Sequence, residues 1–418
     1  MTKTEETKSV PITKPMVWQA WKKVKSNKGS AGVDEQTLTQ FEENLSKNLY
    51  KVWNRLSSGS YFPSAVKRVA IPKKAGGQRK LGIPTITDRI AQMVAKDYLE
   101  ARFESLFHPH SYGYRPMKSA HQAVEQVKDN CRKYGWVIDM DIKGFFDNID
   151  HDLLIKVLST QVEEKWVMMY IKRWLKVPVQ EVNGEMTVHE GKGTPQGGPI
   201  SPLLANVFLH YTLDNWLEVN YPQVMFVRYA DDVIIHCSSK EEADRLLKTI
   251  AIRMQQCKLQ LHPKKTQVVY CKSYKRKEHH PNVKFDFLGF SFQPRSLRGK
   301  QTGRMFLGFG PQVSTESRKR MVGEVSRMRI HRWSTGTIEE LAALLNPKIR
   351  GWMNYYGKIH RRGLDRVFRA LHWRLMKWAS NRYKAFKGSI NRSYELIRRM
   401  FCERRDLFSH WRAGYQLV

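Results

Sequence analysis

The sequence predicts an α+β protein, in which strands and helices build an acidic sheet and a set of basic helices follows. Two apolar runs, residues 136–141 and 226–237, carry Asp residues in the pattern of β-strands. Elsewhere, apolar residues recur at three- and four-residue steps, as they do on one face of a helix. From about residue 314 the chain becomes rich in Arg and Trp and poor in acids.

Composition points to a polyanionic partner. The chain has 418 residues, of which 41% are hydrophobic, so it can bury a large core and is expected to divide into two or three lobes. Its 72 Lys and Arg residues against 39 Asp and Glu residues give a net charge of +33. Nucleic acid is the first candidate for such a surplus. No apolar run is long enough to span a membrane, so no membrane partner is expected.

The ends and cysteines of the chain point to a cytoplasmic location. The N-terminus lacks the apolar core of a secretory signal and does not have the composition of a transit peptide. Five scattered cysteines without a C-x-x-C pair predict reduced thiols rather than disulfides or a zinc site.

The first elements are expected to be scaffold followed by a basic hairpin. Two helices and then two strands are predicted, at 14–28, 38–56, 66–74 and 79–84. Lys73 and Arg79 lie on the hairpin. The ammonium group of Lys73 is a point charge and the guanidinium of Arg79 is planar with several donors, so together they could orient the phosphates of a nucleoside triphosphate. The alternatives are a solvated hairpin or a contact with template phosphates.

A helix at 88–107 is followed by an aromatic loop, residues 110–116, that contains Arg115. This loop could stack on a base or line a groove, or it could pack between lobes. The sequence leaves both interpretations open.

Two acidic strands suggest a metal site. Asp141 ends the strand 136–141, and Asp231 and Asp232 lie at the tip of a predicted hairpin in 226–237. A solvated turn is the alternative for the hairpin. Because Mg²⁺ is bound by one or two carboxylates together with substrate phosphates, two such strands can converge on divalent cations. The pattern is the outline of a two-metal phosphoryl-transfer site.

Several residues near these strands are candidates for nucleotide contacts. Phe146 lies five residues after Asp141, and beside a bound sugar its ring would exclude a 2′-hydroxyl; a buried core Phe is the alternative. After a hairpin predicted around Asn183-Gly184, the stretch 193–202 contains two glycines that allow backbone to approach a base or sugar closely. Asp150 is expected to cap a helix rather than to bind metal.

The later elements complete the sheet and the basic region. Helices are predicted at 203–218 and 240–257, Lys265 lies where the next strand begins, and the aromatic run 285–292 is expected to close the sheet. In the basic helices, Trp and Tyr residues are interleaved with Arg, which fits a surface that grips a phosphate backbone. A solvated charged face is the alternative.

In this order the motifs resemble a reverse transcriptase encoded by a bacterial group II intron. The resemblance rests on Tyr229–Asp232, Asp141–Ile149, Gly193–Pro199 and Phe287–Phe290, with weaker likeness at Gly29, Gly32, Asp34 and Arg350–Tyr356. It implies a right-hand polymerase fold, with fingers and a palm that has an antiparallel sheet and helices, followed by an all-α basic thumb or maturase domain. The implied domains are 1–297, 298–383 and a short basic DNA-binding tail, 384–418.

The resemblance also implies a role for each matching residue. Asp141, Asp231 and Asp232 would be catalytic and would hold two Mg²⁺ ions, with Mn²⁺ as a substitute and Ile142 as a further ligand. Nucleotide contacts are implied for Lys73, Arg79, Phe146, Gln196 and Lys265. Nucleic-acid contacts are implied for Arg115, Gly197, Gly198, Tyr229, Trp352 and Tyr355. The implied partners are dNTPs, an RNA template with a DNA primer, group II intron RNA and target DNA.

The resemblance leaves alternatives open. The chain ends at Val418, so it resembles the compact subclass without an HNH endonuclease. An RNA-binding maturase without polymerase activity and a reverse transcriptase recruited to CRISPR or phage defence share these motifs. A nucleotidyl cyclase also uses acidic strands, but the basic helices and Gln196–Gly198 favour long nucleic acid.

Overall fold

The computed structural model describes residues 10–72, 78–188, 191–194, 197–298, 303–333, 335–387 and 389–416, with the side chain of Arg79 left out. The chain forms two compact units. The first consists of residues 1–119, 138–235 and 240–267, and the second consists of residues 120–137, 236–239 and 268–418. Among the described residues, no helix is both long and apolar enough to cross a membrane.

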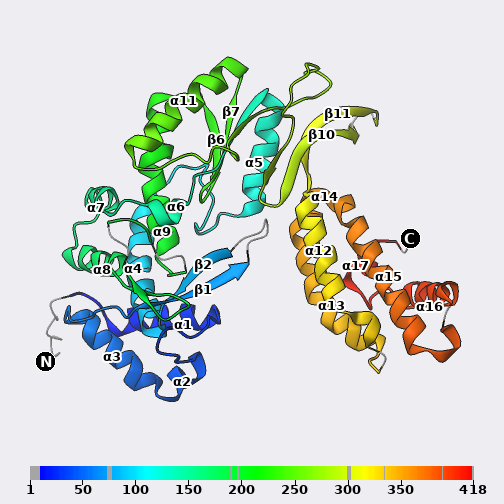
Figure 1. Cartoon of the computed structure of the whole chain (residues 1–418), viewed down its shortest axis with the longest axis horizontal. Coiled ribbons are helices and arrows are strands. Elements are labelled where there is room, and N and C mark those ends of the chain that lie inside the picture. The colour runs from blue at the N-terminus through cyan, green and yellow to red at the C-terminus, as the bar shows by residue number, and fades with distance from the viewer. Residues whose placement is uncertain are drawn as a thin grey trace, which may run out of the picture. The chain divides into compact units, whose positions relative to one another are not determined.

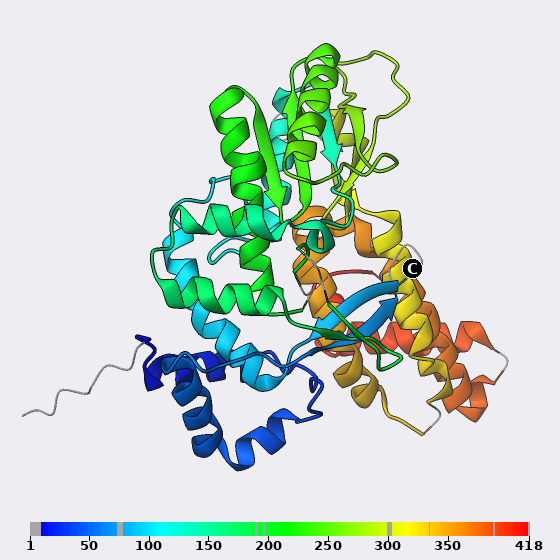
Figure 2. The same ribbon diagram turned by 60° about the vertical axis from the view of Figure 1, so that its left-hand side comes forward.

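The first unit begins with a group of helices, drawn in blue in Figure 2. They are α1 (Lys14–Ser26), α2 (Leu38–Glu43) and α3 (Leu45–Ser57). α1 and α3 pack with α4 (Ile86–Phe103), and α2 packs on α3. Val17, Trp21 and Val24 form the buried face of α1. The single helix predicted for 38–56 is interrupted at Asn44, whose φ and ψ of −122° and 41° are not helical.

A four-stranded sheet follows, in the order β2-β1-β4-β5. Its strands are β1 (Val66–Pro72), β2 (Gln78–Ile83), β4 (Val179–Gln180) and β5 (Met186–Thr187). β1 pairs antiparallel with β2, with Ile71 opposite Arg79, and β4 pairs antiparallel with β5. Both predicted hairpins are therefore confirmed, although the tip of the first lies outside the described residues.

The acidic sheet has the order β6-β7-β3-β8. Its strands are β3 (Trp136–Met140), β6 (Met225–Tyr229), β7 (Asp232–Cys237) and β8 (Gln267–Tyr270). β7 lies next to β3, so the two strands for which the sequence predicted acids are neighbours. Val233, Ile234 and Ile235 of β7 are buried, which anchors the strand that begins with Asp232.

The first unit contains further helices. They are α6 (Phe145–Asn148), α7 (His151–Ser159), α8 (Lys165–Leu175), α9 (Ser201–Leu209), α10 (Asn215–Asn220) and α11 (Lys240–Gln256). Of these, α11 lies beside β6 and β7 in Figure 1. The helix predicted at 203–218 is confirmed, but a π-helical turn, His210–Asp214, separates α9 from α10. Asp150 caps α7 through a hydrogen bond from the Leu153 amide at 3.0 Å, as predicted.

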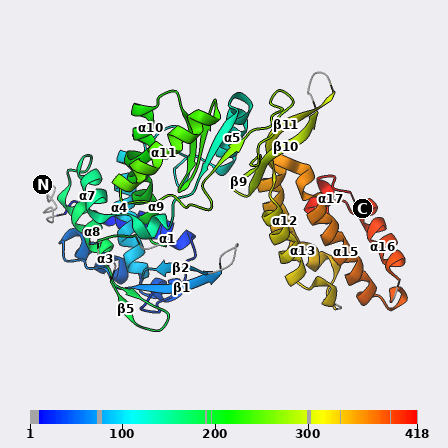
Figure 3. The same cartoon turned by 45° about the horizontal axis from the view of Figure 1, so that its top comes forward.

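The second unit contains α5 (Ala120–Lys133) and a separate three-stranded sheet, in the order β11-β10-β9 (Figure 3). The strands are β9 (Phe285–Phe287), β10 (Phe290–Arg298) and β11 (Met305–Val313). The prediction that 285–292 is one strand that closes the acidic sheet is wrong. Leu288 and Gly289 have φ of +49° and +81°, so the chain turns there, and β8 occupies the edge of the acidic sheet instead.

Helices make up the rest of the second unit. They are α12 (Thr315–Arg327), α13 (Ile338–Trp352), α14 (Lys358–His360), α15 (Asp365–Arg382), α16 (Ile390–Glu403) and α17 (Ser409–Arg412). α12 and α16 pack on α15, and α17 packs on α13. Phe408 and Trp411 are buried. The segment predicted as a DNA-binding tail is thus part of this helical unit as far as residue 416, and its contact with DNA stays a prediction.

Candidate active site

The turn that carries two of the predicted catalytic acids, Tyr229–Asp232, joins β6 to β7. This carboxylate turn has Ala230 at φ +57°, and the left-handed region costs a residue with a Cβ roughly 1–2 kcal/mol. Asp232 is the first residue of β7. The predicted hairpin with acids at its tip is confirmed.

Asp141 directly follows β3, and the segment 260–266 fixes its backbone. The His262 amide donates to the Asp141 carbonyl at 2.8 Å. The Asp141 amide in turn donates to the Thr266 hydroxyl oxygen at 3.3 Å. Ile142 forms an isolated antiparallel bridge with the same segment. These contacts place the third predicted acid at the end of β3, beside β7.

The acids of the two strands interact electrostatically. Asp232 is exposed to solvent, but the protein atoms around its carboxylate displace much of the water that would hydrate it. This desolvation, followed by repulsion from Asp231, Asp141 and Asp139, raises the pKa of Asp232 to about 7. Lys265 acts in the opposite direction. The three predicted catalytic acids therefore act on one another in the folded protein.

Lys265 lies beside these acids. Its Nζ is 2.9 Å from Asp141 Oδ2, and the Lys265 side chain is 60% exposed. An exposed ion pair contributes at most about 1 kcal/mol, so the ammonium group can leave Asp141 at little cost. The position agrees with the role that the sequence implied.

The chemistry of these donors fits a hard divalent cation, which prefers carboxylate and carbonyl oxygens. Within the described ranges, no three His, Cys, Asp or Glu residues form a complete cation site. The raised pKa of Asp232 nevertheless shows an excess of negative charge, and a cation would relieve it. Asp141, Asp231 and Asp232 are the residues that would hold it.

Phe146 lies against the Gly-rich stretch that the sequence singled out. Its carbonyl accepts a hydrogen bond from the Thr194 amide at 2.8 Å, and the Gly193 amide donates to Ile149 at 2.8 Å. The Phe146 side chain is only 9% exposed and packs edge to face with Phe145, at 5.4 Å between ring centroids. The structure therefore brings two predicted nucleotide-contacting regions together.

Packing within the protein requires glycine at position 197, whereas at position 198 the nearest atom belongs to a flexible side chain. A Cβ at Gly197, where φ is +126°, would overlap the carbonyl oxygen of Gly82 in β2. A Cβ at Gly198 would lie 2.5 Å from Gln92 Oε1 in α4. The sequence interpretation attributed these glycines to the approach of a base or sugar, and the structure gives a different reason for Gly197.

Three predicted nucleotide-binding groups cannot be placed. Lys73 and Gln196 lie outside the described residues, and only the backbone of Arg79 is described, in β2. Their roles stay predictions.

The guanidinium of Arg115 forms hydrogen bonds with other residues of the protein. Its Nη2 donates to Glu104 Oε1 at 2.8 Å, and its Nη1 donates to the carbonyls of His108 and Ser111, each at 2.8 Å. Nε also bonds the Glu104 carboxylate. Because each nitrogen of the guanidinium has a protein partner, the structure favours packing for this loop and does not support a phosphate contact by Arg115.

The aromatic residues predicted to bind nucleic acid differ in their surroundings. The Tyr355 hydroxyl donates to the Leu288 carbonyl at 2.9 Å, and its ring stacks on Phe290. Tyr355 thus serves packing of the second unit. Trp352 at the end of α13 and Tyr229 at the carboxylate turn are half-buried, and their contacts with nucleic acid stay predictions.

Sequence reasoning missed two residues near the site. Asp139 lies two residues before Asp141, on the same face of β3, and contributes to the raised pKa of Asp232. Its period-two spacing was an available signal. Arg228 is completely buried in β6 and pairs with Asp214. In the sequence, the only indication of this buried pair was a single Arg between apolar residues of the predicted strand.

Comparison with known proteins identifies the family. The reverse transcriptase (RNA-dependent DNA polymerase) family matches residues 71–292, which is more than half of the chain and contains Asp141, Asp231 and Asp232. The chain belongs to the reverse transcriptase family. In this reverse transcriptase, residues 318–394 also match the maturase-specific domain of group II introns. The resemblance to a group II intron reverse transcriptase and maturase is confirmed, and the compact subclass without an HNH endonuclease stays a prediction.

Relatives of this reverse transcriptase include intron-encoded proteins. The chain is 37% identical over 195 residues to the group II intron-encoded protein LtrA of Lactococcus lactis. The aligned region covers 46% of this chain and 32% of LtrA. It is 32% identical over 248 residues to protein YkfC of Escherichia coli, covering 50% of this chain and 64% of YkfC. An uncharacterized 91 kDa protein in the cob intron of Schizosaccharomyces pombe is 26% identical over 426 residues, covering 84% and 50% of the two chains. The matches thus span between about a third and two thirds of these relatives.

Proposed function

We propose that this reverse transcriptase is an RNA-directed DNA polymerase that extends a DNA primer on an RNA template. The observation that supports the proposal is that β3 and β7 are neighbours in the sheet, with Asp141 directly after β3 and Asp232 at the start of β7. Repulsion from Asp231 and Asp141, which helps to raise the pKa of Asp232, agrees with it. Acids that repel one another in this way favour cations, and phosphoryl transfer depends mainly on positioning and charge neutralisation.

The residues of the site divide this work between them. Asp141, Asp231 and Asp232 would hold two Mg²⁺ ions, or Mn²⁺ in their place, with the Ile142 carbonyl as a further ligand. Such ions, when bound, activate the primer 3′-hydroxyl and neutralise the leaving pyrophosphate. Lys265, whose ammonium group is exposed and 2.9 Å from Asp141, can donate a hydrogen bond to a phosphate oxygen.

The residues around the acids would select and orient the nucleotide. Phe146, next to Thr194, would exclude a ribose 2′-hydroxyl. Gln196, Gly197 and Gly198 would lie along the base and sugar, and Lys73 and Arg79 would bind the triphosphate. These assignments rest on the motifs in the sequence.

The second part of the proposal is that the chain is a group II intron maturase. The match of 318–394 to the maturase-specific domain and the net charge of +33 support binding to intron RNA. By analogy with intron-encoded relatives, splicing of that RNA and DNA synthesis at a target DNA would take place in the bacterial cytoplasm.

Primer extension by an Asp231→Ala variant tests the polymerase assignment. Loss of one metal-binding carboxylate is expected to lower RNA-templated extension by at least a hundredfold, because electrostatic groups at such sites each contribute about 10²–10³. RNA affinity, measured by filter binding, should stay within about twofold of wild type, since the basic surfaces are unchanged.

Asp152→Asn is the matched control, because Asp152 is an exposed acid in the first turn of α7. It is expected to extend primers normally. Equal extension by wild type and Asp231→Ala would overturn the assignment. A wild-type chain that binds intron RNA without extending primers would establish the alternative, a maturase without polymerase activity.

A further inference from the structure

A completely buried ion pair contacts the carboxylate turn. Arg228 of β6 and Asp214 both have 0% side-chain exposure. Arg228 Nε donates to Asp214 Oδ1 at 2.7 Å, and Nη2 donates to Oδ2 at 2.5 Å. Two parallel bonds of this kind fix the plane of the guanidinium.

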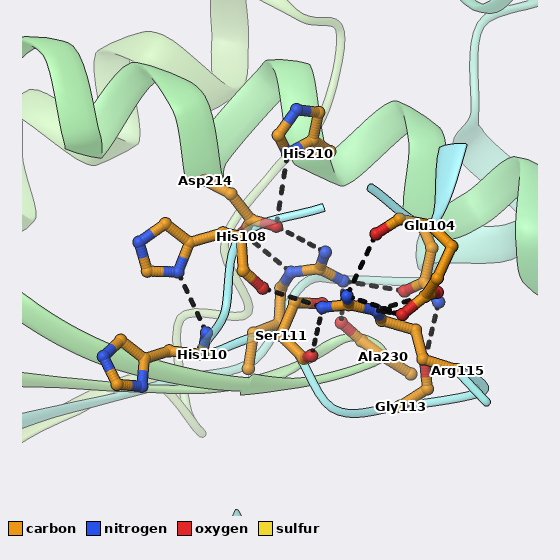
Figure 4. A network of polar contacts seen from close by, with 11 residues as sticks. Glu104, His108, His110, Ser111, Gly113, Arg115, His210, Asp214 and Ala230 are labelled. Carbon is orange, nitrogen blue, oxygen red and sulfur yellow. Dashed lines mark hydrogen bonds and ion pairs between the residues drawn. The ribbon is translucent and has the colours of Figure 1, made fainter. Parts of the chain in front are cut away.

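The remaining nitrogen of Arg228 reaches the carboxylate turn itself. Nη1 donates to the Ala230 carbonyl at 3.1 Å and to Asn206 Oδ1 at 2.9 Å. Asn206 Nδ2 donates to the Gly113 carbonyl at 2.7 Å. Because one end of the amide accepts and the other donates, Asn206 has a single consistent orientation. Figure 4 shows Asp214, Gly113 and Ala230 around this network.

The loop that leads to Gly113 also contacts the carboxylate turn and the end of β6. The Arg228 amide donates to the His110 carbonyl at 2.9 Å, and the Tyr112 amide donates to the Arg228 carbonyl at 2.8 Å. Gly113 then packs so closely that a Cβ there would overlap the Ala230 nitrogen. Ala230 is therefore held at its carbonyl by Arg228 and confined at its nitrogen by Gly113.

The π-helical turn explains how Asp214 reaches Arg228. Asp214 is the last residue of His210–Asp214, and such turns insert one extra residue into a helix, often at functional sites. Arg253 of α11 donates to the carbonyls of Thr212 and Tyr211 at 3.1 and 3.2 Å. These bonds satisfy carbonyls inside the altered turn and keep Asp214 in place.

We propose that Arg228, Asp214 and Asn206 are positioning residues of the polymerase site. They hold the Ala230 peptide in its left-handed conformation, and through it they fix the position of Asp231 and of Asp232, where β7 begins. A non-glycine residue with positive φ persists only where its surroundings over-determine it. Here Arg228 Nη1 bonds the Ala230 carbonyl, the guanidinium is fixed by its bonds to Asp214 and Asn206, and Gly113 packs against the Ala230 nitrogen. The inference rests on the proposed function, because it concerns the cation-binding acids.

Arg228→Lys tests the proposal with the buried charge retained. The lysine can still pair with Asp214, but one ammonium group cannot bond Asp214, Asn206 and Ala230 in the geometry of the planar guanidinium. We expect kcat for primer extension to fall at least tenfold and KM for the dNTP to change less than twofold. Mn²⁺ binding to the protein alone, titrated by electron paramagnetic resonance, should weaken at least fivefold.

Asn206→Ala is the second variant and leaves the ion pair intact. It is expected to lower kcat and Mn²⁺ affinity about threefold, and it decides the question if Arg228→Lys does not fold. Arg173→Lys is the control, because Arg173 Nη1 donates to the Gly59 carbonyl at 2.8 Å and packs on Phe62 rather than on the turn. It should lower the melting temperature without changing kcat or Mn²⁺ affinity.

The outcomes separate this inference from the proposed function. Wild-type kcat and Mn²⁺ affinity in folded Arg228→Lys, or in Asn206→Ala if the first does not fold, would overturn the positioning role while wild-type extension still supports the polymerase. Absence of extension by the wild-type chain, with Mn²⁺ binding unaffected by Asp231→Ala, would instead overturn the polymerase assignment.

Discussion

The charge of Asp232 works against the stability of the metal-free protein. Its pKa of about 7 in the folded chain lies above the ordinary value of 3.8. Between these two pH values the native state binds a proton that the unfolded chain has released, so the free energy of unfolding falls as pH rises through this window. The contribution of Asp232 to stability is greatest at low pH and is lost by about pH 7. A carboxylate with the proposed metal-binding role would thus be kept at a cost to the stability of the fold.

Asp232→Asn should therefore raise the melting temperature of the metal-free protein at pH 8, because the amide cannot ionise. The increase should be a few degrees at most, since solvent screening limits the repulsion at a side chain with accessible surface. Scanning calorimetry in the presence of a chelator measures it. At pH 4 the two proteins should differ less. A lower melting temperature for the variant at pH 8 would contradict the sign of this effect.

Phe146 allows a test of nucleotide selection at the same scale. Phe146→Val replaces the aromatic ring of Phe146 with a smaller side chain, so a ribose 2′-hydroxyl should be accepted more readily if this ring is the proposed steric barrier. We expect the ratio of kcat/KM for rNTP over dNTP to rise by about tenfold or more, as for other losses of steric exclusion. Steady-state extension with each nucleotide gives the ratio.

Phe145→Val is the matched control, because Phe145 is the adjacent buried ring, 2% exposed. Both variants should lose roughly 1–4 kcal/mol of stability from the cavity. Only the change at position 146 should alter the nucleotide ratio. Equal ratios in both variants would assign Phe146 to the core alone, the alternative that the sequence left open.

At the scale of elements, local patterns predicted the strands and hairpins that carry Asp141, Asp231 and Asp232. Alternating apolar residues and Asn-Gly or Asp-Asp turns act over a few neighbouring positions, so one sequence reveals them. The turn at Leu288–Gly289 was missed because Leu is rare at positive φ. An aromatic run through that point predicts one strand, although the backbone makes two.

The support of the site could not be predicted in the same way. Arg228, Asp214, Asn206 and Gly113 lie on separate elements, and each is ordinary within its own stretch of sequence. Their contacts depend on tertiary packing, and so do the hydrogen bonds between Arg115 and Glu104. The sequence predicted the carboxylates, but the side chains that contact their turn were visible only in the fold.

The end of α12 offers a test of element stability away from the site. Arg329 follows this helix with φ of +46° and an exposed side chain, where Gly is the preferred residue. Arg329→Gly should raise stability by roughly 1 kcal/mol by removing the left-handed strain. Chemical denaturation measures the change, and Arg329→Lys should leave it unaltered. Destabilisation by Gly would show that the Arg side chain outweighs the backbone strain.

At the scale of the whole molecule, the net charge of +33 must be distributed over particular surfaces to recognise RNA. One such surface is the exposed face of α15, which carries Arg366, Arg369, Trp373 and Lys377. Lys377 Nζ lies 5.3 Å from the centre of the Trp373 ring. Several of these residues border an open cavity of about 560 Å³ between α12 and α15. Cations beside an exposed aromatic ring suit phosphates and an unpaired base.

Replacing three cations of the α15 face should change how salt weakens RNA binding. Each phosphate contact that is lost lowers the slope of log K against log salt by about 0.7–0.9, so Arg366→Gln with Arg369→Gln and Lys377→Gln should lower it by about 2. Binding to intron RNA measured from 50 to 500 mM salt gives the slope.

A triple substitution of Lys47, Lys51 and Arg55 by Gln is the control for total charge, because these exposed cations lie on one face of α3. It removes the same number of charges as the α15 variant. A slope that falls only for the α15 variant means that RNA contacts this face directly. Equal falls would mean that no single face accounts for binding, since a local contact releases counterions only where the phosphates lie.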